Sequence, residues 1–129
     1  MSNSTEQTPP TGPQLLDPDA LAWEDLGVDG DRAEIKPTVT PRESRTFGAG
    51  FGRFERARFD WRLTYDECVH VLEGEMEVIH DGTTVRATAG QVVFIPAGSD
   101  VTYVFPGTCT IFYATYPVDW QERLEAGDA

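Results

Sequence analysis

From Ala33 to Pro117 the chain is a succession of short runs of β-branched and aromatic residues, and turn signals separate the runs. The clearest turn signal is Asp81-Gly82, which lies between the alternating segments Val69–Ile79 and Thr83–Ala87. Asp-Gly favours a type I′ turn, because both central residues of that turn need positive φ, and such a turn joins two strands into a hairpin. Short strands at this spacing are typical of a β-sandwich or a β-barrel. The sequence therefore predicts an all-β domain of seven or eight strands without a long helix.

The length of the chain indicates how many domains it forms, and its charge limits the classes of partner that it can bind. A chain of 129 residues suits one domain with one hydrophobic core. Its 22 acidic and 10 basic side chains give a net charge of −12, which repels nucleic-acid phosphates and anionic membrane surfaces. The sequence has no run of about 18 apolar residues and no basic start followed by an apolar stretch. We predict no nucleic-acid partner, no membrane partner and a cytoplasmic location.

Composition divides the chain into three regions. Residues 1–19 are rich in Ser, Thr, Pro, Gln and Asp and predict a flexible N-terminal tail. Residues 20–120 contain the barrel with an N-terminal extension, in which Ala20–Leu26 is expected to form one short helical turn. Trp23 in that turn is expected to pack on the barrel exterior or on a second subunit. Residues 121–129 are expected to form a C-terminal tail.

Two spaced strings of residues lie within the barrel region. Glu67 is followed after three residues by Val71-Leu72-Glu73-Gly74, and Gly90 is followed after five residues by Pro96-Ala97-Gly98. The strings resemble the motifs of the cupin superfamily, which are usually written H-x-H-x(3,4)-E-x(6)-G and G-x(5)-P-x-G-x(2)-H. This resemblance implies a single antiparallel jelly-roll β-barrel.

The histidines of those two motifs are missing from this chain. The residues at their positions are Trp61 and Leu63, or Asp60 and Arg62 under the longer spacing, and Val101 in the second motif. Of four expected metal ligands only Glu67 remains, whereas a catalytic metal site needs about three protein ligands. The sequence therefore predicts a metal-independent protein without a cofactor.

Glu67 is the first candidate for chemistry, since the cupin resemblance directs its side chain into the barrel. Strand alternation then points Val69 and Val71 inward as well. A carboxyl among apolar neighbours has a raised pKa, which suits a general acid or base working near neutral pH. The alternative is a structural role, in which Glu67 accepts hydrogen bonds from Arg58, Arg62 or a tyrosine.

Aromatic and hydroxyl side chains supply the other candidates. Val101 takes the place of an inward histidine, so the strand period directs Tyr103 and Phe105 into the lumen too. Such a pocket, mostly apolar with a few polar groups, is typical of small-molecule sites. The alternative is that these aromatic residues fill the core. The predicted catalytic residues are Glu67, Tyr65 and Asp66, and the predicted ligand-binding residues are Trp61, Arg62, Tyr103, Phe105 and Tyr113.

Two further patterns receive structural interpretations. Cys68 and His70 share a strand face opposite Glu67, but one thiol and one imidazole fall short of a closed metal site. We expect both cysteines of the chain, Cys68 and Cys109, to be reduced and buried. Glu73, Glu75 and Glu77 form an acidic stripe at strand spacing, which favours a solvated sheet face or a protected edge.

A closer resemblance extends from Phe47 to Trp120. The chain resembles the ethanolamine-utilisation cupin family called EutQ, which implies a dimer, association with bacterial microcompartments and an acetate kinase activity. It also implies that Tyr65, Asp66 and Glu67 line the cavity. Longer members of that family carry a substantial region before the cupin domain that this chain does not match. The strings that carry the resemblance are Gly48-Ala-Gly-Phe51, Phe59-x-Trp61-x-Leu63, Tyr65-Asp66-Glu67, Val71-Leu-Glu-Gly-Glu75, Phe94-Ile-Pro96 with Gly98-Ser99, and Thr115-Tyr-Pro117 with Trp120.

Two function hypotheses follow. The first is a metal-independent binding or accessory protein of amine catabolism, with a small molecule in the lumen, a second copy as dimer partner and a microcompartment shell protein as a further partner. The second is a metal-free isomerase, cyclase or lyase, in which Glu67 transfers protons together with Tyr65 or Tyr103. The acetate kinase activity receives no support from a phosphate-binding motif, because no G-x(4)-G-K-[ST] string occurs and Lys36 is the only lysine.

Overall fold

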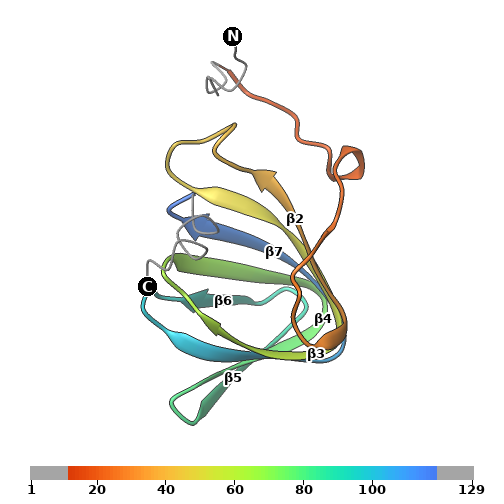
Figure 1. Cartoon of the computed structure of the whole chain (residues 1–129), viewed down its shortest axis with the longest axis vertical. Helices are drawn as coiled ribbons and strands as arrows, with labels where there is room; N and C mark the ends of the chain where they lie inside the picture. The colour runs from red at the N-terminus through yellow and green to blue at the C-terminus, as the bar shows by residue number, and fades with distance from the viewer. Residues whose placement is uncertain (1–11, 119–129) are drawn as a thin grey trace.

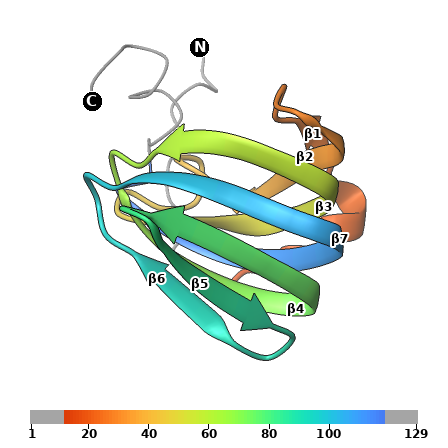
Figure 2. The ribbon, with the colours of Figure 1, turned by 90° about the horizontal axis from the view of Figure 1, so that it is seen from below.

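The computed structural model describes residues 12–118, which form a single curled β-sheet (Figure 1). The sheet is antiparallel throughout, in the order β1-β2-β3-β7-β4-β5, with β6 paired to β4. Figure 2 shows that the long strands curve, so that the sheet wraps around an interior as a barrel. The predicted all-β barrel is confirmed. The elements are η1 (Pro18–Ala20), β1 (Glu24–Asp25), β2 (Gly30–Val39), β3 (Gly48–Arg62), β4 (Asp66–His80), β5 (Thr83–Thr88), β6 (Val92–Ile95) and β7 (Asp100–Tyr116).

Strands β4 and β7 lie in the middle of this sheet. The first part of β4, Glu67–His70, pairs with β6, and its last part, Glu75–His80, pairs with β5. The opposite edge of β4 pairs with β7, and the other edge of β7 pairs with β3. Because both strands are hydrogen-bonded on two sides, side chains that project inward from them have fixed positions.

A β-bulge in β3 allows apolar residues from both halves of the strand to face the interior. The pairing with β7 shifts between Glu55 and Ala57, where Arg56 has a φ of 43°. Side chains alternate across a strand, so one extra residue reverses which positions point inward. Phe54 and Ala57 are therefore both buried, although three positions separate them.

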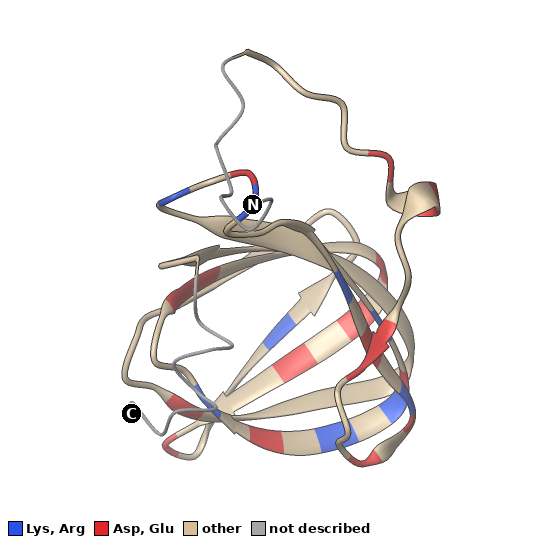
Figure 3. Ribbon diagram, turned by 45° about the horizontal axis from the view of Figure 1, so that its top comes forward, with Lys and Arg blue, Asp and Glu red and all other residues tan. Residues whose placement is uncertain are grey.

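A second irregularity does the same in β4. The pairing with β7 shifts around Gly74, and Val71 and Met76 on either side of it are both fully buried. Glu75 consequently faces outward, where its carboxylate pairs with Arg86 of β5 at 2.8 Å. Glu73 is exposed on the same surface, as the sequence interpretation expected. Figure 3 shows acidic and basic positions interspersed along the strands of the barrel wall.

Pro106 lies inside β7, and the residues on either side of it, Val101–Phe105 and Thr108–Tyr116, belong to that one strand. Both neighbouring strands have their irregularities opposite this point, since Glu55 pairs with Thr108 while Ala57 pairs with Phe105. The ladder therefore needs no hydrogen bond from the proline nitrogen, and the strand continues.

The N-terminal extension differs from the expected helical turn. The 3-10 turn comes earlier, at Pro18–Ala20, and Glu24–Asp25 forms β1 against β2. Pro18, within the predicted tail, accepts a hydrogen bond from the ammonium group of Lys36 at 2.8 Å. The predicted C-terminal tail, residues 121–129, lies outside the described residues. No helix in the described range is long and apolar enough to cross a membrane.

Candidate functional site

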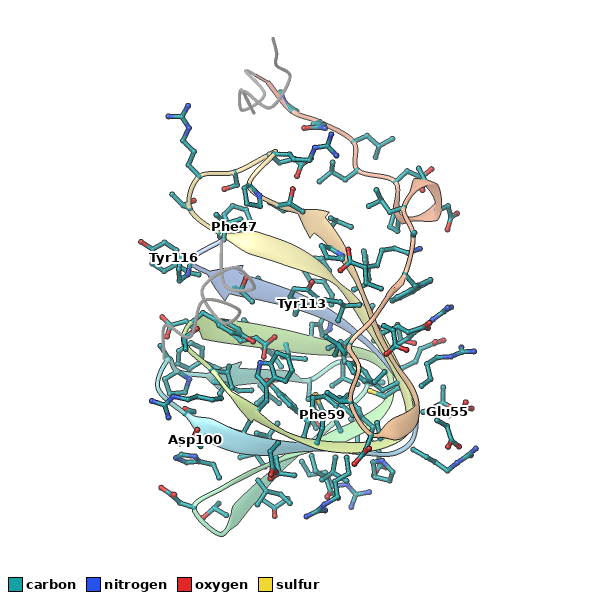
Figure 4. All side chains as sticks on the ribbon, viewed as in Figure 1. Phe47, Glu55, Phe59, Asp100, Tyr113 and Tyr116 are labelled. Atoms are coloured by element: carbon teal, nitrogen blue, oxygen red, sulfur yellow. The ribbon has the colours of Figure 1, made fainter. Side chains whose placement is uncertain are left out.

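The barrel interior contains a cavity of about 50 Å³. A buried water occupies roughly 10–15 Å³ on this measure, so the cavity has room for about four waters or an organic molecule of that size. In Figure 4, Phe59 of β3 and Tyr113 of β7 project inside the barrel wall, whereas Glu55 projects outward. Most of the lining residues are aromatic, and one of them has an acidic side chain. The lining residues are Leu26, Ile35, Val69 and Ile111, the aromatic Phe54, Phe59, Trp61, Tyr65, Tyr103, Phe105 and Tyr113, and the acidic Glu67.

Glu67 is the polar centre of this lining. Its backbone lies between Ile95 of β6 and Thr115 of β7, and its side chain points into the lumen. The Tyr103 hydroxyl donates a hydrogen bond to Glu67 Oε1 at 2.6 Å. Burial raises the pKa of Glu67 from its ordinary 4.5 to about 7, although the bond from Tyr103 acts in the opposite direction. This carboxyl can therefore give or take a proton near neutral pH.

Three phenols line the cavity with Glu67. Burial, and then the negative charge of Glu67, raise the pKa of Tyr65 and of Tyr103 well above the ordinary value of 10.0. The same two causes, in the same order, raise the pKa of Tyr113. The indole of Trp61 donates a hydrogen bond from Nε1 to the Tyr65 hydroxyl at 2.8 Å, which fixes the position of that phenol. All three hydroxyls keep their protons at physiological pH, and that of Tyr103 is donated to Glu67.

The N-terminal extension contributes one wall of the cavity. Leu26 lines the lumen, and its backbone N–H donates to the Ala33 carbonyl of β2 at 2.9 Å. Trp23 is held on the barrel exterior, because its ring lies 4.6 Å from Lys36 Nζ and 4.2 Å from Arg53 Cζ. In Figure 1 this orange segment runs alongside the barrel. The exterior packing expected for Trp23 is confirmed.

Comparison with known proteins places the chain in a family. The family model described as ethanolamine utilisation protein EutQ matches residues 24–122. The chain belongs to the EutQ family. It is 38% identical over 99 residues to the acetate kinase EutQ of Clostridioides difficile, a match that covers 77% of this chain and 63% of the relative. It is 42% identical over 83 residues to the acetate kinase EutQ of Salmonella typhimurium, covering 64% and 36%. The chain thus spans less than two thirds of these curated relatives.

Solved structures agree with the family assignment. The crystal structure of an ethanolamine utilization protein EutQ from Salmonella typhimurium has a TM-score of 0.74 at 33% identity, over 81% of this chain and 85% of that one. The Clostridium difficile EutQ structure has a TM-score of 0.72 at 33% identity, over 85% and 79%. An RmlC-like cupin from Shewanella frigidimarina shares the fold, with a TM-score of 0.68 over 82% of this chain and 92% of that one, at 20% identity. The predicted cupin jelly-roll fold is therefore confirmed.

The EutQ-family barrel gathers most of the sequence-predicted site residues around one lumen. Trp61 of β3 reaches it from the strand beside β7. Glu67 comes from β4, and Tyr65 from the turn that precedes β4. The strand period along β7 was the signal that found Tyr103 and Phe105, whereas Tyr113 was a candidate because of its hydroxyl. The predicted residues that line the cavity are Trp61, Tyr65, Glu67, Tyr103, Phe105 and Tyr113.

Asp66 and Arg62 do not line the cavity, so the expectation that Tyr65, Asp66 and Glu67 all line it is wrong for Asp66. Asp66 is exposed, and its Oδ1 accepts a hydrogen bond from the backbone N–H of Ala97 at 2.8 Å. Arg62 pairs with Asp100 at 2.9 Å on the outer surface. Both residues are next to inward positions, so strand alternation turns them away from the lumen.

The outer side of β4 corrects one expectation about the thiols. Cys109 is buried as predicted, whereas Cys68 is exposed. Cys68 lies on the outward face of β4, which in the described chain has no covering element over it, while Cys109 points into the core from β7. His70 is half-buried on the same outward face as Cys68.

Sequence reasoning missed five lining residues, of which one is Ile111 of β7 and the other four come from β3, β2 and the N-terminal extension. Phe54 and Phe59 both face inward only because the bulge at Arg56 lies between them. Ile35 of β2 reaches the lumen opposite Gly52, a position without a side chain of its own. The fourth, Leu26, had a visible signal, since it is an apolar residue in an otherwise polar loop.

The donor set around the lumen does not fit the metal site of typical cupins. Trp61, Leu63 and Val101 stand at three histidine positions and offer no ligand atom to a transition metal. Across residues 12–118 no three His, Cys, Asp or Glu side chains come together in an arrangement that could hold a metal ion. Glu67 alone supplies a carboxylate to the cavity.

Proposed function

We propose that this EutQ-family chain binds a small organic molecule in the barrel lumen, with Glu67 as the polar anchor, and serves ethanolamine utilisation as a binding or accessory protein. The observation that carries the proposal is a single carboxyl, bonded to Tyr103, inside a cavity whose other walls are aromatic and aliphatic. Ligand sites are commonly apolar hollows with a few polar groups that fix orientation. The cavity volume of about 50 Å³ favours a ligand of few non-hydrogen atoms.

A binding screen tests this proposal. Two-carbon amines, alcohols, aldehydes and carboxylates are titrated into the isotopically labelled protein, and NMR shifts of lumen residues are followed. We expect saturable shifts for at least one compound. The variant Ile111→Phe, which fills the cavity, should lose them, whereas Val85→Phe on the exposed part of β5 should keep them. The proposal fails if no compound binds, or if Ile111→Phe binds as well as the natural chain.

The second candidate is an acid/base enzyme, which the pKa of about 7 at Glu67 favours. Tyr103, which bonds to Glu67, or Tyr65, which lines the same cavity, would be the proton-transfer partner. Glu67→Gln separates the two functions, because glutamine keeps the shape and the acceptor oxygen but cannot transfer a proton. Retained binding with lost turnover would indicate the enzyme, and it would be measured on whichever compound the screen identifies.

Phosphoryl transfer is a third activity to measure, because the curated relatives are named acetate kinase. Phosphoryl transfer depends on cationic groups or a metal that stabilise the developing charge, and no Lys or Arg in the described chain lines the lumen. This geometry therefore supports binding rather than phosphoryl transfer. Acetate-dependent formation of ADP from ATP and Mg²⁺ by the purified chain would replace the binding proposal with the kinase.

Dimerisation is proposed through the outer apolar face, defined as Cys68, Leu72, Val92, Phe94, Phe112 and Ala114, which surround His70. Phe94 is 63% exposed and Val92 is 57% exposed. Cys68 pairs with Phe94 on one side and with Ala114 on the other, so these residues are contiguous. A twofold axis brings a surface against itself, and these uncharged side chains avoid the repulsion that a net charge of −12 produces elsewhere.

We expect Phe94→Asp to convert a dimer into a monomer, because it places two carboxylates at a twofold apolar contact. Light scattering coupled to size exclusion measures the mass directly. Val85→Asp is the matched control, since Val85 is 48% exposed but lies on β5, away from the outer apolar face. An unchanged dimer mass in Phe94→Asp would place the interface elsewhere. Association with a microcompartment shell protein stays a prediction, and co-purification with shell proteins tests it.

A further inference from the structure

We infer that the ligand of the lumen is a small organic ammonium ion, bound by the Glu67 carboxylate within a cage of aromatic rings. This inference rests on the proposed function, because it names the class of molecule that the same cavity binds. Three features of the cavity support it independently: its charge, its aromatic walls and its size.

The charge of the lining selects against anions. Glu67 is the one acidic lining residue, and no Lys, Arg or His of the described chain lines the cavity. The basic side chains near the barrel are engaged on its outside, as when Arg53 pairs with Glu34 at 2.6 Å and Arg62 pairs with Asp100 at 2.9 Å. A carboxylate or phosphate ligand would lose its water without gaining a counter-charge, whereas an ammonium ion gains one in Glu67.

The aromatic walls supply the second attraction. The ring of Phe59 lies 5.4 Å from Tyr103, the residue that holds Glu67, and 6.0 Å from Trp61. The faces of Trp, Tyr and Phe attract cations through the ring quadrupole, and proteins use aromatic side chains around a site to recognise ammonium groups. A neutral or anionic ligand gains nothing from that quadrupole, so these rings discriminate by charge.

Size and hydroxyl chemistry restrict the ammonium ion further. A cavity of about 50 Å³ fits a primary amine with about four non-hydrogen atoms better than a trimethylated head group. Tyr113 lines the same space and keeps its hydroxyl proton, so it can hydrogen-bond to a hydroxyl on the ligand. An amino alcohol meets both requirements.

Protonation of Glu67 makes the binding depend on pH in a direction that identifies the ligand's charge. With a pKa of about 7, Glu67 is mostly protonated at pH 6 and mostly ionised at pH 8. A primary amine remains an ammonium ion over that range. The ammonium ion requires the ionised carboxylate, so its affinity should increase about tenfold from pH 6 to pH 8, and binding at pH 6 should release close to one proton. Acetate would show the opposite dependence.

The test is calorimetry on the full chain with ethanolamine, ethylene glycol, acetate and tetramethylammonium at pH 6, 7 and 8, in two buffers of different ionisation enthalpy. We expect ethanolamine to bind more tightly than its neutral isostere ethylene glycol, and tetramethylammonium to bind weakly. Glu67→Gln should weaken ethanolamine binding at least tenfold at pH 8. Asp66→Asn is the matched control, since Asp66 is the neighbouring carboxylate and faces away from the cavity, and it should leave the affinity unchanged. Phe59→Leu should weaken ethanolamine binding more than ethylene glycol binding.

The outcomes separate this inference from the proposed function. If ethylene glycol or acetate binds in the lumen more tightly than ethanolamine, or if affinity for the amine decreases as pH rises, the ammonium assignment is wrong while the binding function stands. If none of the four compounds binds, and the wider screen finds no ligand, both fail. If Glu67→Gln still binds ethanolamine and Asp66→Asn does not, the amine binds on the outside of the barrel. That result would overturn the inference.

Discussion

Replacing Gly74 by alanine is expected to lower the free energy of unfolding by about 4 kcal/mol, the largest effect of any single methyl group in this barrel. Gly74 has a φ of 82°, a conformation that costs an L-residue with a side chain about 1–2 kcal/mol. A Cβ atom there would also collide with the backbone carbonyl of Thr108 on β7. Since backbone on a central strand cannot move without disturbing the ladder, the two penalties add.

Urea unfolding of Gly74→Ala beside Gly82→Ala measures the collision separately from the strain. Gly82 has a φ of 76° but has open space around it, so its alanine variant carries only the conformational penalty of about 1–2 kcal/mol. A Gly74→Ala variant that is no less stable than Gly82→Ala would show that β4 and β7 are further apart than described. A Gly74→Ala variant that fails to fold, while Gly82→Ala folds, agrees with the expectation.

Glu67→Gln is expected to stabilise the protein relative to the natural chain at pH 8, by about 3 kcal/mol more than at pH 4.5. Burial raises the pKa of Glu67 from 4.5 to about 7. Between these two values the folded chain holds a proton that the unfolded chain has already released, so rising pH favours unfolding. The stability contributed by the neutral carboxyl is complete below pH 4.5 and is lost as pH rises through 7. Glutamine is neutral throughout and lacks this dependence.

The measurement is the difference in unfolding free energy between Glu67→Gln and the natural chain at half-unit steps from pH 4.5 to pH 8.5. Glu73→Gln, which removes one exposed negative charge from the same strand, reports what the change in net charge does by itself. Tyr103→Phe removes a bond that lowers the pKa of Glu67, so the loss of stability should extend to higher pH. A difference that stays constant over the whole pH range would mean that Glu67 is ionised as in water.

The Glu67 site also shows where sequence reasoning succeeds. Glu67, Val69 and Val71 lie on an uninterrupted stretch of β4, and Tyr103 and Phe105 lie on an uninterrupted stretch of β7. Within such a stretch the direction of each side chain follows from its parity alone. The cupin-like spacing supplied one inward-facing position in each strand. That position was enough to predict that Glu67 and Tyr103 both face the lumen, where the Tyr103 hydroxyl donates a hydrogen bond to Glu67 Oε1 at 2.6 Å.

By itself, the sequence determined the all-β architecture and the absence of histidines from the two cupin-like motifs, and the resemblance to cupins implied the inward direction of Glu67. The first two properties depend on local alternation and on residue identity, which a sequence displays directly. Only the tertiary structure decided that Phe54 and Phe59 both face the lumen, that β7 continues through Pro106, and that Leu26 closes one wall. Each of these depends on a bulge or a neighbouring strand distant in sequence, and a register between strands is fixed by both partners together rather than by either segment alone.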